Sequence, residues 1–315
     1  MEKLPQIDRS TRGRQLFLVL LLVVACAEGN AETLPIAFED ARSGSSRSLL
    51  QAGALDITAF GAMPDDGVDD TSAIQKAIDT ARGKGMVVYV PSGEYLISDT
   101  LRAMQQVTFN AAKKRWVHDR RKANALVGST NGRRPVLRLS NNSAGFDDPS
   151  KPKPLIWIWS QPRDGDRNLG SKNPQDEQPN ISFNQVFRGI DIDLRADGNR
   201  GAVGIRHAGS QGSSIEDVEI VATGAYSGLY NPPGQGGGVY GVSITGGRYG
   251  VWANHSARYP VMAGIRFKNQ EDAAIYWKGQ SNLTVAGFVI DKQTAGPVVA
   301  LTAGRLPYNR ALTLV

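Results

Sequence analysis

A short segment of constant form recurs six times after residue 188, and this recurrence limits the folds that the chain can adopt. Each segment places two apolar residues on either side of one variable residue. The first apolar residue stands at positions 190, 218, 242, 265, 288 and 312, so the spacings are 28, 24, 23, 23 and 24 residues. A nearly constant period of this size is typical of a solenoid, in which each repeat packs on the next.

A second series runs half a period out of phase with the first. Its apolar residues stand at positions 205, 229, 251, 275 and 299, and Gly, Asn and Ser fill many of the connections. Neither gap shows the period of 3.6 residues that a helix would require. We therefore predict two or three short strands per turn, stacked in parallel at about 4.8 Å per turn. The expected fold is all-β, a single-stranded parallel β-helix.

The N-terminus has the form of an export signal. Four basic residues precede an apolar run of ten residues, 16–25, which is too short to span a bilayer as a helix. We assign residues 1–26 to a signal peptide and predict export to the bacterial periplasm, the outer membrane as a lipoprotein, or the extracellular space.

Cys26 is the only cysteine, so the chain cannot form an intramolecular disulfide. Residues 23–26, Val-Val-Ala-Cys, have the form of a lipobox, which favours lipidation of Cys26. Residues 25–27 also fit ordinary signal cleavage, and the sequence leaves both alternatives open. Any attachment to a membrane is expected only through such a lipid.

The formal net charge of +6 does not indicate a nucleic-acid partner. Residues 113–134 carry a net charge of +7 and residues 1–26 a net charge of +2, which leaves the remainder slightly acidic. A single basic loop without a series of stacking aromatic residues is typical of a solvated insertion. We therefore expect no nucleic-acid binding.

One amphipathic helix is expected before the solenoid. Residues 27–53 are polar and are predicted to be a linker, and the β-helix is assigned to residues 54–315. A strand at 55–62 leads into an Asp/Gly-rich turn, after which Asp70 or Thr71 can cap a helix. Its expected apolar face is Ala73, Ile74, Ala77, Ile78 and Ala81. Such a helix would cover the open end of the first turn, so we predict an N-terminal capping helix.

Three runs around this helix carry a family resemblance. Residues 56–62 (DITAFGA), 66–75 (DGVDDTSAIQ) and 88–95 (VYVPSGEY) resemble the N-terminal signature of the pectate-lyase-3-like superfamily. The resemblance implies a right-handed β-helix. It does not specify the substrate, because the superfamily includes polygalacturonase-related enzymes, β-1,3-glucanases and phage tailspikes.

Residues 101–185 are the least periodic part, and we interpret them as early turns with long insertions. Strands are expected at 125–128, 135–139 and 155–159. In the last of these, two Trp alternate with two Ile, so one pair must face the core.

Several motifs from Phe187 onward resemble the first β-helix of the exo-β-1,3-glucanases of glycoside hydrolase family 55. They include residues 204–207 (GIRH), 211–218 (QGSSIEDV) and 244–250 (ITGGRYG). The resemblance implies a second β-helix that contributes most of the catalytic acid. Since the chain ends in a strand segment, we predict that the β-helix is incomplete: either the chain is a fragment of a longer protein, or another domain or chain, such as a second β-helix, covers its C-terminal edge.

Outward positions of a stacked series form columns that suit a repeating polymer. Tyr230, Trp252 and Tyr276 fall in one such column, about 5 Å apart, and are candidates for stacking on sugar rings. Arg206, at the matching position of the preceding turn, is a further candidate for binding substrate.

Carboxyl groups occupy the outward column of the first series. Asp191, Asp193 and Glu219 are the catalytic candidates, because adjacent turns or alternate residues of one strand place carboxyl groups at separations that glycoside hydrolysis uses. A solvated acidic face is the alternative. Arg266 and Lys268 lie further along this column and are candidates for substrate binding.

A lyase is the other chemistry natural to this fold, with Ca²⁺ held by acidic residues and a Lys or Arg accepting the proton. Apart from that case we predict no cofactor and no metal. The polygalacturonase motifs are absent, and we expect His207 to be a hydrogen-bonded corner residue.

The predicted function is that of an exported carbohydrate-active protein, most simply a glycoside hydrolase-like enzyme that acts on a β-1,3-glucan or pectin type of polysaccharide. The alternatives are a noncatalytic glycan-binding or adhesion β-helix and a polysaccharide lyase.

Overall fold

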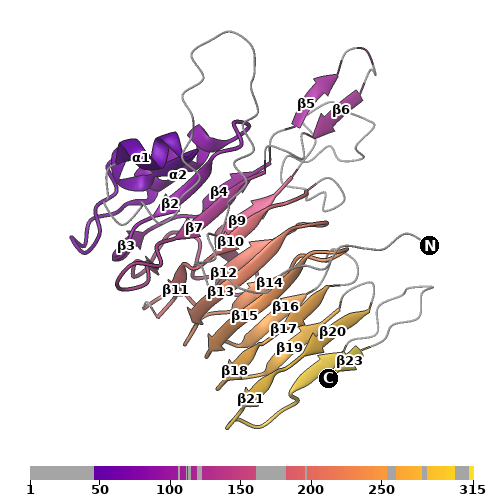
Figure 1. Ribbon diagram of the computed structural model, residues 1–315. Coiled ribbons are helices and arrows are strands. Elements are labelled where there is room, and N and C mark those ends of the chain that lie inside the picture. The colour runs from indigo at the N-terminus through magenta and orange to yellow at the C-terminus, as the bar shows by residue number, and fades with distance from the viewer. Residues whose placement is uncertain are drawn as a thin grey trace, which may run out of the picture. The chain divides into compact units, whose positions relative to one another are not determined.

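The chain folds into a parallel β-helix with three strands in each complete turn (Figure 1). The computed structural model describes residues 46–105, 107–110, 112, 115–118, 123–160, 182–195, 197–253, 260–278, 282–301 and 312–315. Every strand pairing within its two large sheets is parallel, and each strand pairs with the strands one turn before and one turn after it. The predicted fold class is therefore confirmed, with the right-handed connection that parallel strands adopt.

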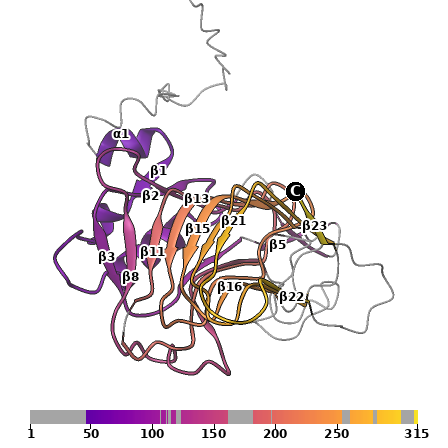
Figure 2. The same ribbon diagram turned by 90° about the horizontal axis from the view of Figure 1, so that it is seen from below.

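The larger sheet, called sheet A, has 14 strands in two columns that lie side by side (Figure 2). The first column comprises β1 (Ala54–Asp56), β2 (Val87–Val90), β7 (Ala125–Gly128), β10 (Val186–Arg188), β13 (Ser214–Val221), β15 (Gly238–Thr245), β17 (Val261–Ala263), β20 (Leu283–Ala286) and β23 (Leu312–Leu314). The second column comprises β3 (Glu94–Ile97), β8 (Val136–Leu139), β11 (Asp191–Asp193), the second halves of β13 and β15, β18 (Arg266–Lys268) and β21 (Val289–Asp291). The first five segments of the first repeated series lie in this second column. The sixth, residues 312–314, was wrongly assigned to that series, because it pairs with β20 and forms β23 of the first column.

The smaller sheet, called sheet B, has seven strands and carries the second repeated series. In spatial order its strands are β4 (Leu101–Met104), β9 (Lys153–Trp159), β12 (Ala202–His207), β14 (Ser227–Tyr230), β16 (Tyr249–Ala253), β19 (Ala273–Trp277) and β22 (Val299–Leu301). Two further strands, β5 (Val107–Asn110) and β6 (Arg115–His118), form an antiparallel hairpin in the segment predicted to be an insertion. The three strands expected in the aperiodic part of the sequence are all present, as β7, β8 and β9.

A column of left-handed residues makes the bend between the two columns of sheet A. The backbone φ is positive at the same corner in five successive turns, at Gly189 (68°), Asp217 (53°), Gly241 (61°), Gly264 (65°) and Gly287 (56°). This conformation is readily accessible to glycine and costly for most other residues. The corner therefore explains why most repeated segments of the first series begin with glycine.

A second column of glycines lies in sheet B, where there is no room for a larger side chain. A Cβ on Gly228 would lie 2.6 Å from the Ile244 side chain, and one on Gly250 would lie 2.6 Å from the carbonyl oxygen of Ala274. These positions point inward against the neighbouring turn. The side chain that follows each glycine in the sequence fills the core.

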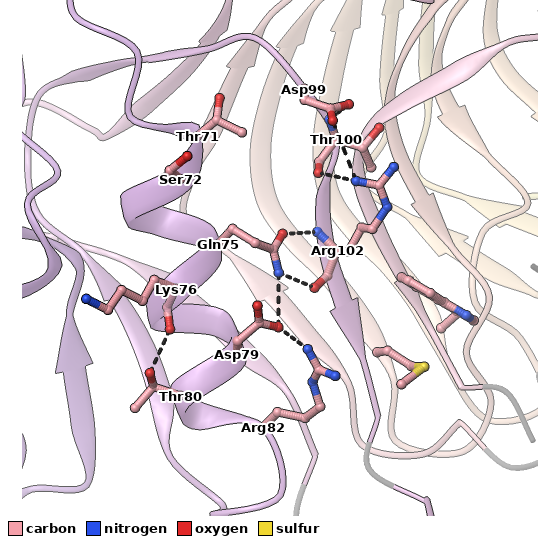
Figure 3. Close-up of a pocket in the computed structure, with 12 residues that line it drawn as sticks. Thr71, Ser72, Gln75, Lys76, Asp79, Thr80, Arg82, Asp99, Thr100 and Arg102 are labelled. Carbon is pink, nitrogen blue, oxygen red and sulfur yellow. Dashed lines mark hydrogen bonds and ion pairs between the residues drawn. The ribbon is translucent and has the colours of Figure 1, made fainter. Parts of the chain in front are cut away.

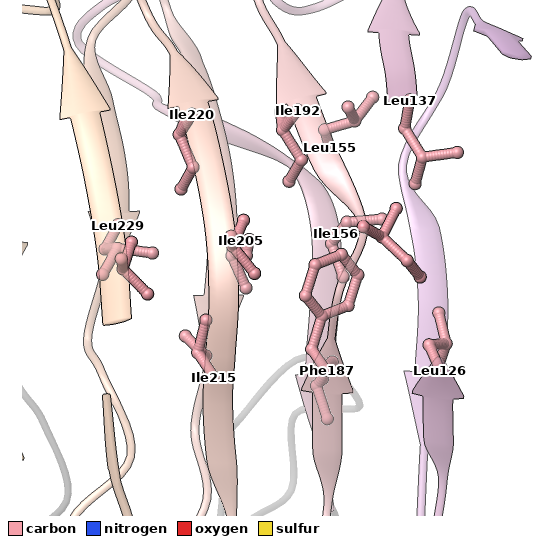
Figure 4. Packing of buried hydrophobic residues seen from close by; sticks show 14 of the residues in the cluster. Leu126, Leu137, Leu155, Ile156, Phe187, Ile192, Ile205, Ile215, Ile220 and Leu229 are labelled. Carbon is pink, nitrogen blue, oxygen red and sulfur yellow. The ribbon is translucent and has the colours of Figure 1, made fainter. Parts of the chain in front are cut away.

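The interior is a continuous stack of aliphatic and aromatic side chains contributed by both sheets (Figure 4). In one pair of turns, Phe187 and Ile192 of sheet A face Ile205 of sheet B, and all three are at most 1% exposed. Each such side chain contributes about 1.5–3 kcal/mol when it is removed from water. From position 190 to position 299, the apolar positions of both repeated series therefore form the core of the solenoid or pack against it.

Helix α2 (Thr71–Ala81) covers the first turn, as predicted. Its buried face is Ile74, Ala77, Ile78 and Ala81. The predicted cap is wrong in one respect: the Asp70 side chain makes no capping hydrogen bond and accepts one from the Met63 N–H at 2.8 Å instead. Burial raises the pKa of this Asp70 carboxyl.

The side chain of Gln75 on helix α2 satisfies the free backbone edge of sheet B. Its Nε2 donates to the carbonyl oxygen of Arg102 at 3.0 Å, and its Oε1 accepts from the Arg102 N–H at 2.8 Å. Strand β4 is the end strand of the sheet, so this amide pairs with it as another strand would.

The folded part begins earlier than predicted. Helix α1 (Ser46–Gln51) occupies the end of the segment assigned to a linker, and its Leu49 is buried. Within the described residues no helix is both long and apolar enough to cross a membrane. The predicted signal peptide and Cys26 lie outside the described residues.

The inward glycines allow a direct test of packing. We expect Gly250→Ala to lower the free energy of unfolding by about 1–3 kcal/mol, because its Cβ would overlap the Ala274 carbonyl and the Phe267 ring. Ala274→Gly, at the same position one turn later, is the matched control and should cost at most about 1 kcal/mol. Urea unfolding of both variants measures the difference, and equal losses would contradict the packing argument.

His207 is buried at the end of strand β12, as the sequence predicted for a corner residue. Its side chain is 0% exposed, and its Nε2 lies 3.3 Å from the carbonyl oxygen of Gln185. Burial lowers the pKa of His207 to about 4. The folded protein therefore keeps this imidazole neutral at pH values where the unfolded chain, with a pKa near 6.5, protonates it.

This difference predicts a pH dependence of stability. Because the unfolded state binds the extra proton, the contribution of His207 is complete above about pH 6.5 and is lost as the pH falls towards 4, by about 3 kcal/mol in total. His207→Gln should flatten the pH dependence of unfolding between these values. Denaturant titrations at several pH values test this, and parallel pH profiles for the two proteins would refute it.

Candidate binding face on sheet B

One outward side chain from every strand of sheet B falls on a single line. In spatial order the line consists of Arg102, Trp157, Arg206, Tyr230, Trp252, Tyr276 and Ala300. We call it the sheet B line. With seven strands about 4.8 Å apart, it extends over about 29 Å. The predicted column of Arg206 and three aromatic residues is therefore present, and it is longer than the sequence indicated.

The rings of this line stack on one another. The Tyr230 and Trp252 centroids are 4.7 Å apart with an interplanar angle of 19°, and Trp252 and Tyr276 are 6.4 Å apart at 31°. The spacing of turns in a β-helix is close to the stacking distance of two aromatic rings, so Tyr230 and Trp252 meet face to face, whereas Trp252 and Tyr276 are tilted relative to each other. The sequence placed these rings in one column and did not reveal that they cover each other.

Arg206 continues the stack in the other direction. Its guanidinium carbon lies 4.9 Å from the centre of the Trp157 ring and 4.6 Å from that of Tyr230, as in cation–π contacts. Trp157 in turn stacks on Trp159 at 4.1 Å. Ile156 and Ile158 fill the core, so the expectation that one pair of this strand faces inward is confirmed.

Accessibility varies along the line. Trp157, Trp159 and Tyr230 are at most 8% exposed. Arg206, Trp252 and Tyr276 are half-buried, and Arg102 is exposed. A bound polymer would therefore meet the edges of the stacked rings in the middle of the line and more open surface at its two ends.

A hollow of about 700 Å³ lies at the first end, between helix α2 and strand β4 (Figure 3). We call it the α2–β4 hollow. Arg102, Met104 and Trp159 form its floor on the outer face of sheet B, and helix α2 forms its wall. Its lining residues are Thr71, Ser72, Gln75, Lys76, Asp79, Thr80, Arg82, Asp99, Thr100, Arg102, Met104 and Trp159.

The charges of this hollow are largely paired. Arg82 forms an ion pair with Asp79, and Lys153 with Asp99 at 2.8 Å. Partial burial raises the pKa of Asp99, but the hydrogen bonds from Lys153 and the Thr100 N–H and the charges of Lys153 and Arg102 outweigh it and hold that pKa below its ordinary value. Asp99 therefore remains ionised and can accept hydrogen bonds at neutral pH.

A smaller hollow of about 340 Å³ lies at the other end of the line. It is lined by Tyr249, Glu271, Asp272, Ala273, Tyr276, Ala295, Gly296, Pro297 and Ala300. Arg248 pairs with Asp272 at 2.5 Å. Since the next residue of the line is Ala300, no ring of the following turn stacks on Tyr276 there.

The three predicted catalytic acids lie on sheet A, away from the sheet B line. Asp191 accepts hydrogen bonds from two nitrogens of Arg134, at 2.8 and 3.0 Å, and one from the Glu219 N–H at 2.8 Å. Arg195 forms an ion pair with Asp193 at 2.7 Å. Asp191 and Glu219 are thus neighbours on adjacent turns, as predicted, and arginines neutralise Asp191 and Asp193.

Arg266 and Lys268 also lie on sheet A, on strand β18, where both are exposed. The structure therefore separates the predicted site residues into two groups, the sheet B line and the second column of sheet A. The described residues contain no group of three or more His, Cys, Asp or Glu side chains placed to hold a metal ion.

Sequence reasoning missed the α2–β4 hollow. Arg102 and Met104 precede the regular repeats, so their alignment with Trp157 and Trp159 could not be counted from a period. The helical spacing of Ser72, Gln75 and Asp79, which puts them on one face, was the available signal.

The stacked sheets and the outward line of sheet B together form the outer face of a parallel β-helix. Residues 54–142 match the family model described as rhamnogalacturonase A/epimerase, pectate lyase-like. Over these residues the chain is similar to the pectate lyase-like family, which agrees with the resemblance to that superfamily seen in the sequence. The narrower resemblance to glycoside hydrolase family 55 stays a prediction.

Individual relatives match short parts of the sequence. The mannuronan C5-epimerase AlgE3 of Azotobacter vinelandii is 38% identical over 78 residues, which are 24% of this chain and 4% of that protein. The non-secreted LysM effector LysM19 of Penicillium expansum is 40% identical over 48 residues, or 15% of this chain and 4% of that protein. An iota-carrageenase structure with bound iota-carrageenan fragments is 11% identical, with a TM-score of 0.47, and covers 77% of this chain and 56% of that one.

The contacts of Asp191 predict a structural effect of its replacement. We expect Asp191→Asn to lower the free energy of unfolding by about 1–3 kcal/mol, because it weakens a charged, two-point hydrogen bond with Arg134. Glu219→Gln, on the next turn and exposed, should change stability by at most about 0.5 kcal/mol. Thermal or urea unfolding compares them, and an unchanged midpoint for Asp191→Asn would show that the pair is not needed for stability.

Proposed function

We propose that this chain is a carbohydrate-active β-helix protein that holds a polysaccharide along the outer face of sheet B. The observation that carries the proposal is the sheet B line, in which six consecutive strands present one arginine or aromatic side chain each. Its period of about 4.8 Å and its length of about 29 Å suit an extended chain of sugar units.

Two further observations support a polysaccharide ligand. The hollows at both ends of the line combine apolar floors with charged side chains, a combination that can contact the ring carbons and the hydroxyl groups of a sugar. The description of the family model that matches residues 54–142 names enzymes that act on polysaccharides. The relative from Azotobacter vinelandii is named for its action on mannuronan.

The structure supports catalysis less directly than it supports polysaccharide binding. A glycoside hydrolase-like or lyase reaction would need acid and base groups beside the bound polymer. The predicted acids Asp191, Asp193 and Glu219 are on the other sheet, and two of them are paired with arginines. This pairing favours a second candidate, a noncatalytic glycan-binding β-helix. Export, with or without lipidation of Cys26, remains part of the proposal.

A panel of polymers separates these candidates. Laminarin, polygalacturonate and alginate should be tested for retention of the protein, for new reducing ends and for unsaturated products, with and without Ca²⁺. Reducing ends would support hydrolysis, unsaturated products would support a lyase, and retention without products would support binding alone. If none of the polymers retains the protein or is changed by it, the proposal is refuted for these substrates.

Trp252 provides the sharpest variant. We expect Trp252→Ala to weaken retention by the bound polymer at least about tenfold, because it removes the half-buried centre of the accessible stack. Tyr240→Ala is the matched control, since Tyr240 is an exposed aromatic residue on sheet A, 40% accessible and off the line. Equal affinities of the two variants would exclude the sheet B line as the binding surface.

A further inference from the structure

The sheet B line is closed at one end by a helix. Strand β4 is the last strand of sheet B, and helix α2 occupies the position where a further strand would pair. The two hydrogen bonds between Gln75 and the backbone of Arg102 hold the helix there (Figure 3). A polymer that follows the line past Trp157 towards Arg102 therefore reaches the wall formed by α2.

The α2–β4 hollow lies in this corner. Its floor belongs to the same outer face as the line, because Arg102 pairs in register with Trp157, and Met104 with Trp159. Its wall consists of side chains on one face of helix α2, among them Ser72, Gln75 and Asp79. A volume of about 700 Å³ is within the range of sites that enclose a small molecule.

The chemistry of the hollow matches a sugar unit. Met104 and Trp159 supply an apolar floor for the carbon face of a ring. Asp79 and Asp99 supply acceptors, and the guanidinium groups of Arg82 and Arg102 supply donors. Because each acid is paired with a cation, the site carries little net charge, so it can exchange hydrogen bonds with several neutral hydroxyl groups.

We propose that the α2–β4 hollow binds the terminal sugar residue of the polysaccharide, so that the protein holds its polymer by one end. An internal residue has a neighbour on both sides, and helix α2 leaves room for the chain on one side only. This inference rests on the proposed function, since it assigns one end of the same binding face.

Counting chain ends tests the proposal. Laminarin, polygalacturonate and alginate are each used intact and after partial acid hydrolysis to fragments of known mean length, at equal mass. For a polymer that binds, the protein bound at saturation should rise in proportion to the number of chain ends. Binding that follows polymer mass regardless of the number of ends would overturn the inference and leave the proposed function intact. Absence of binding to all samples would overturn both.

A pair of Trp variants, one on helix α2 and one just after it, tests where the terminal sugar binds. Ser72 is exposed on the face that lines the hollow, so Ser72→Trp should fill the hollow and weaken binding of the fragments at least about tenfold. Lys84→Trp is the matched control, because Lys84 is exposed and does not line the hollow. Thermal unfolding establishes that both variants are folded. Unchanged binding by folded Ser72→Trp would overturn the assignment.

Discussion

Each strand is paired in parallel with its counterpart one turn away, and this backbone pairing governs the other features of the molecule. It fixes the distance between turns at about 4.8 Å and aligns equivalent residues into columns. In two of these columns the backbone requires glycine at most positions. One is the left-handed corner, which includes Gly241, and the other is the column of inward glycines in sheet B, which includes Gly228. The inner apolar columns then form the core, and the outer columns become the surfaces available for function.

The same spacing decides what an outer column of aromatic residues can do. Rings held about 4.8 Å apart are close enough to stack on each other, so Tyr230 is covered by Arg206 on one side and Trp252 on the other. The accessible chemistry therefore moves to the ring edges and to the ends of the line, where a helix at one end and Ala300 at the other interrupt the stack. Both hollows of sheet B occur at these interruptions.

The acids of sheet A show why a column alone does not establish a catalytic site. The adjacency of Asp191 and Glu219 follows from the repeat and was predicted from it. Arg134, which pairs with Asp191, comes from the loop between β7 and β8, 57 residues earlier, and belongs to no repeat. It also pairs with Asp217, a non-glycine residue in the left-handed corner. Contacts of this kind depend on the path of a loop over the surface of the β-helix, and the repeat period of the sequence does not predict that path.

Local patterns that recur at a constant spacing are enough to predict the solenoid, its period, most core positions and the column of Arg206 with three aromatic residues. The apolar face of helix α2 is likewise a local pattern. The pairing of Arg134 with Asp191 and the hollow between α2 and β4 could not be predicted in this way, because each joins segments that are separated by loops of irregular length. The path of such a loop depends on contacts that form only when the turns are stacked.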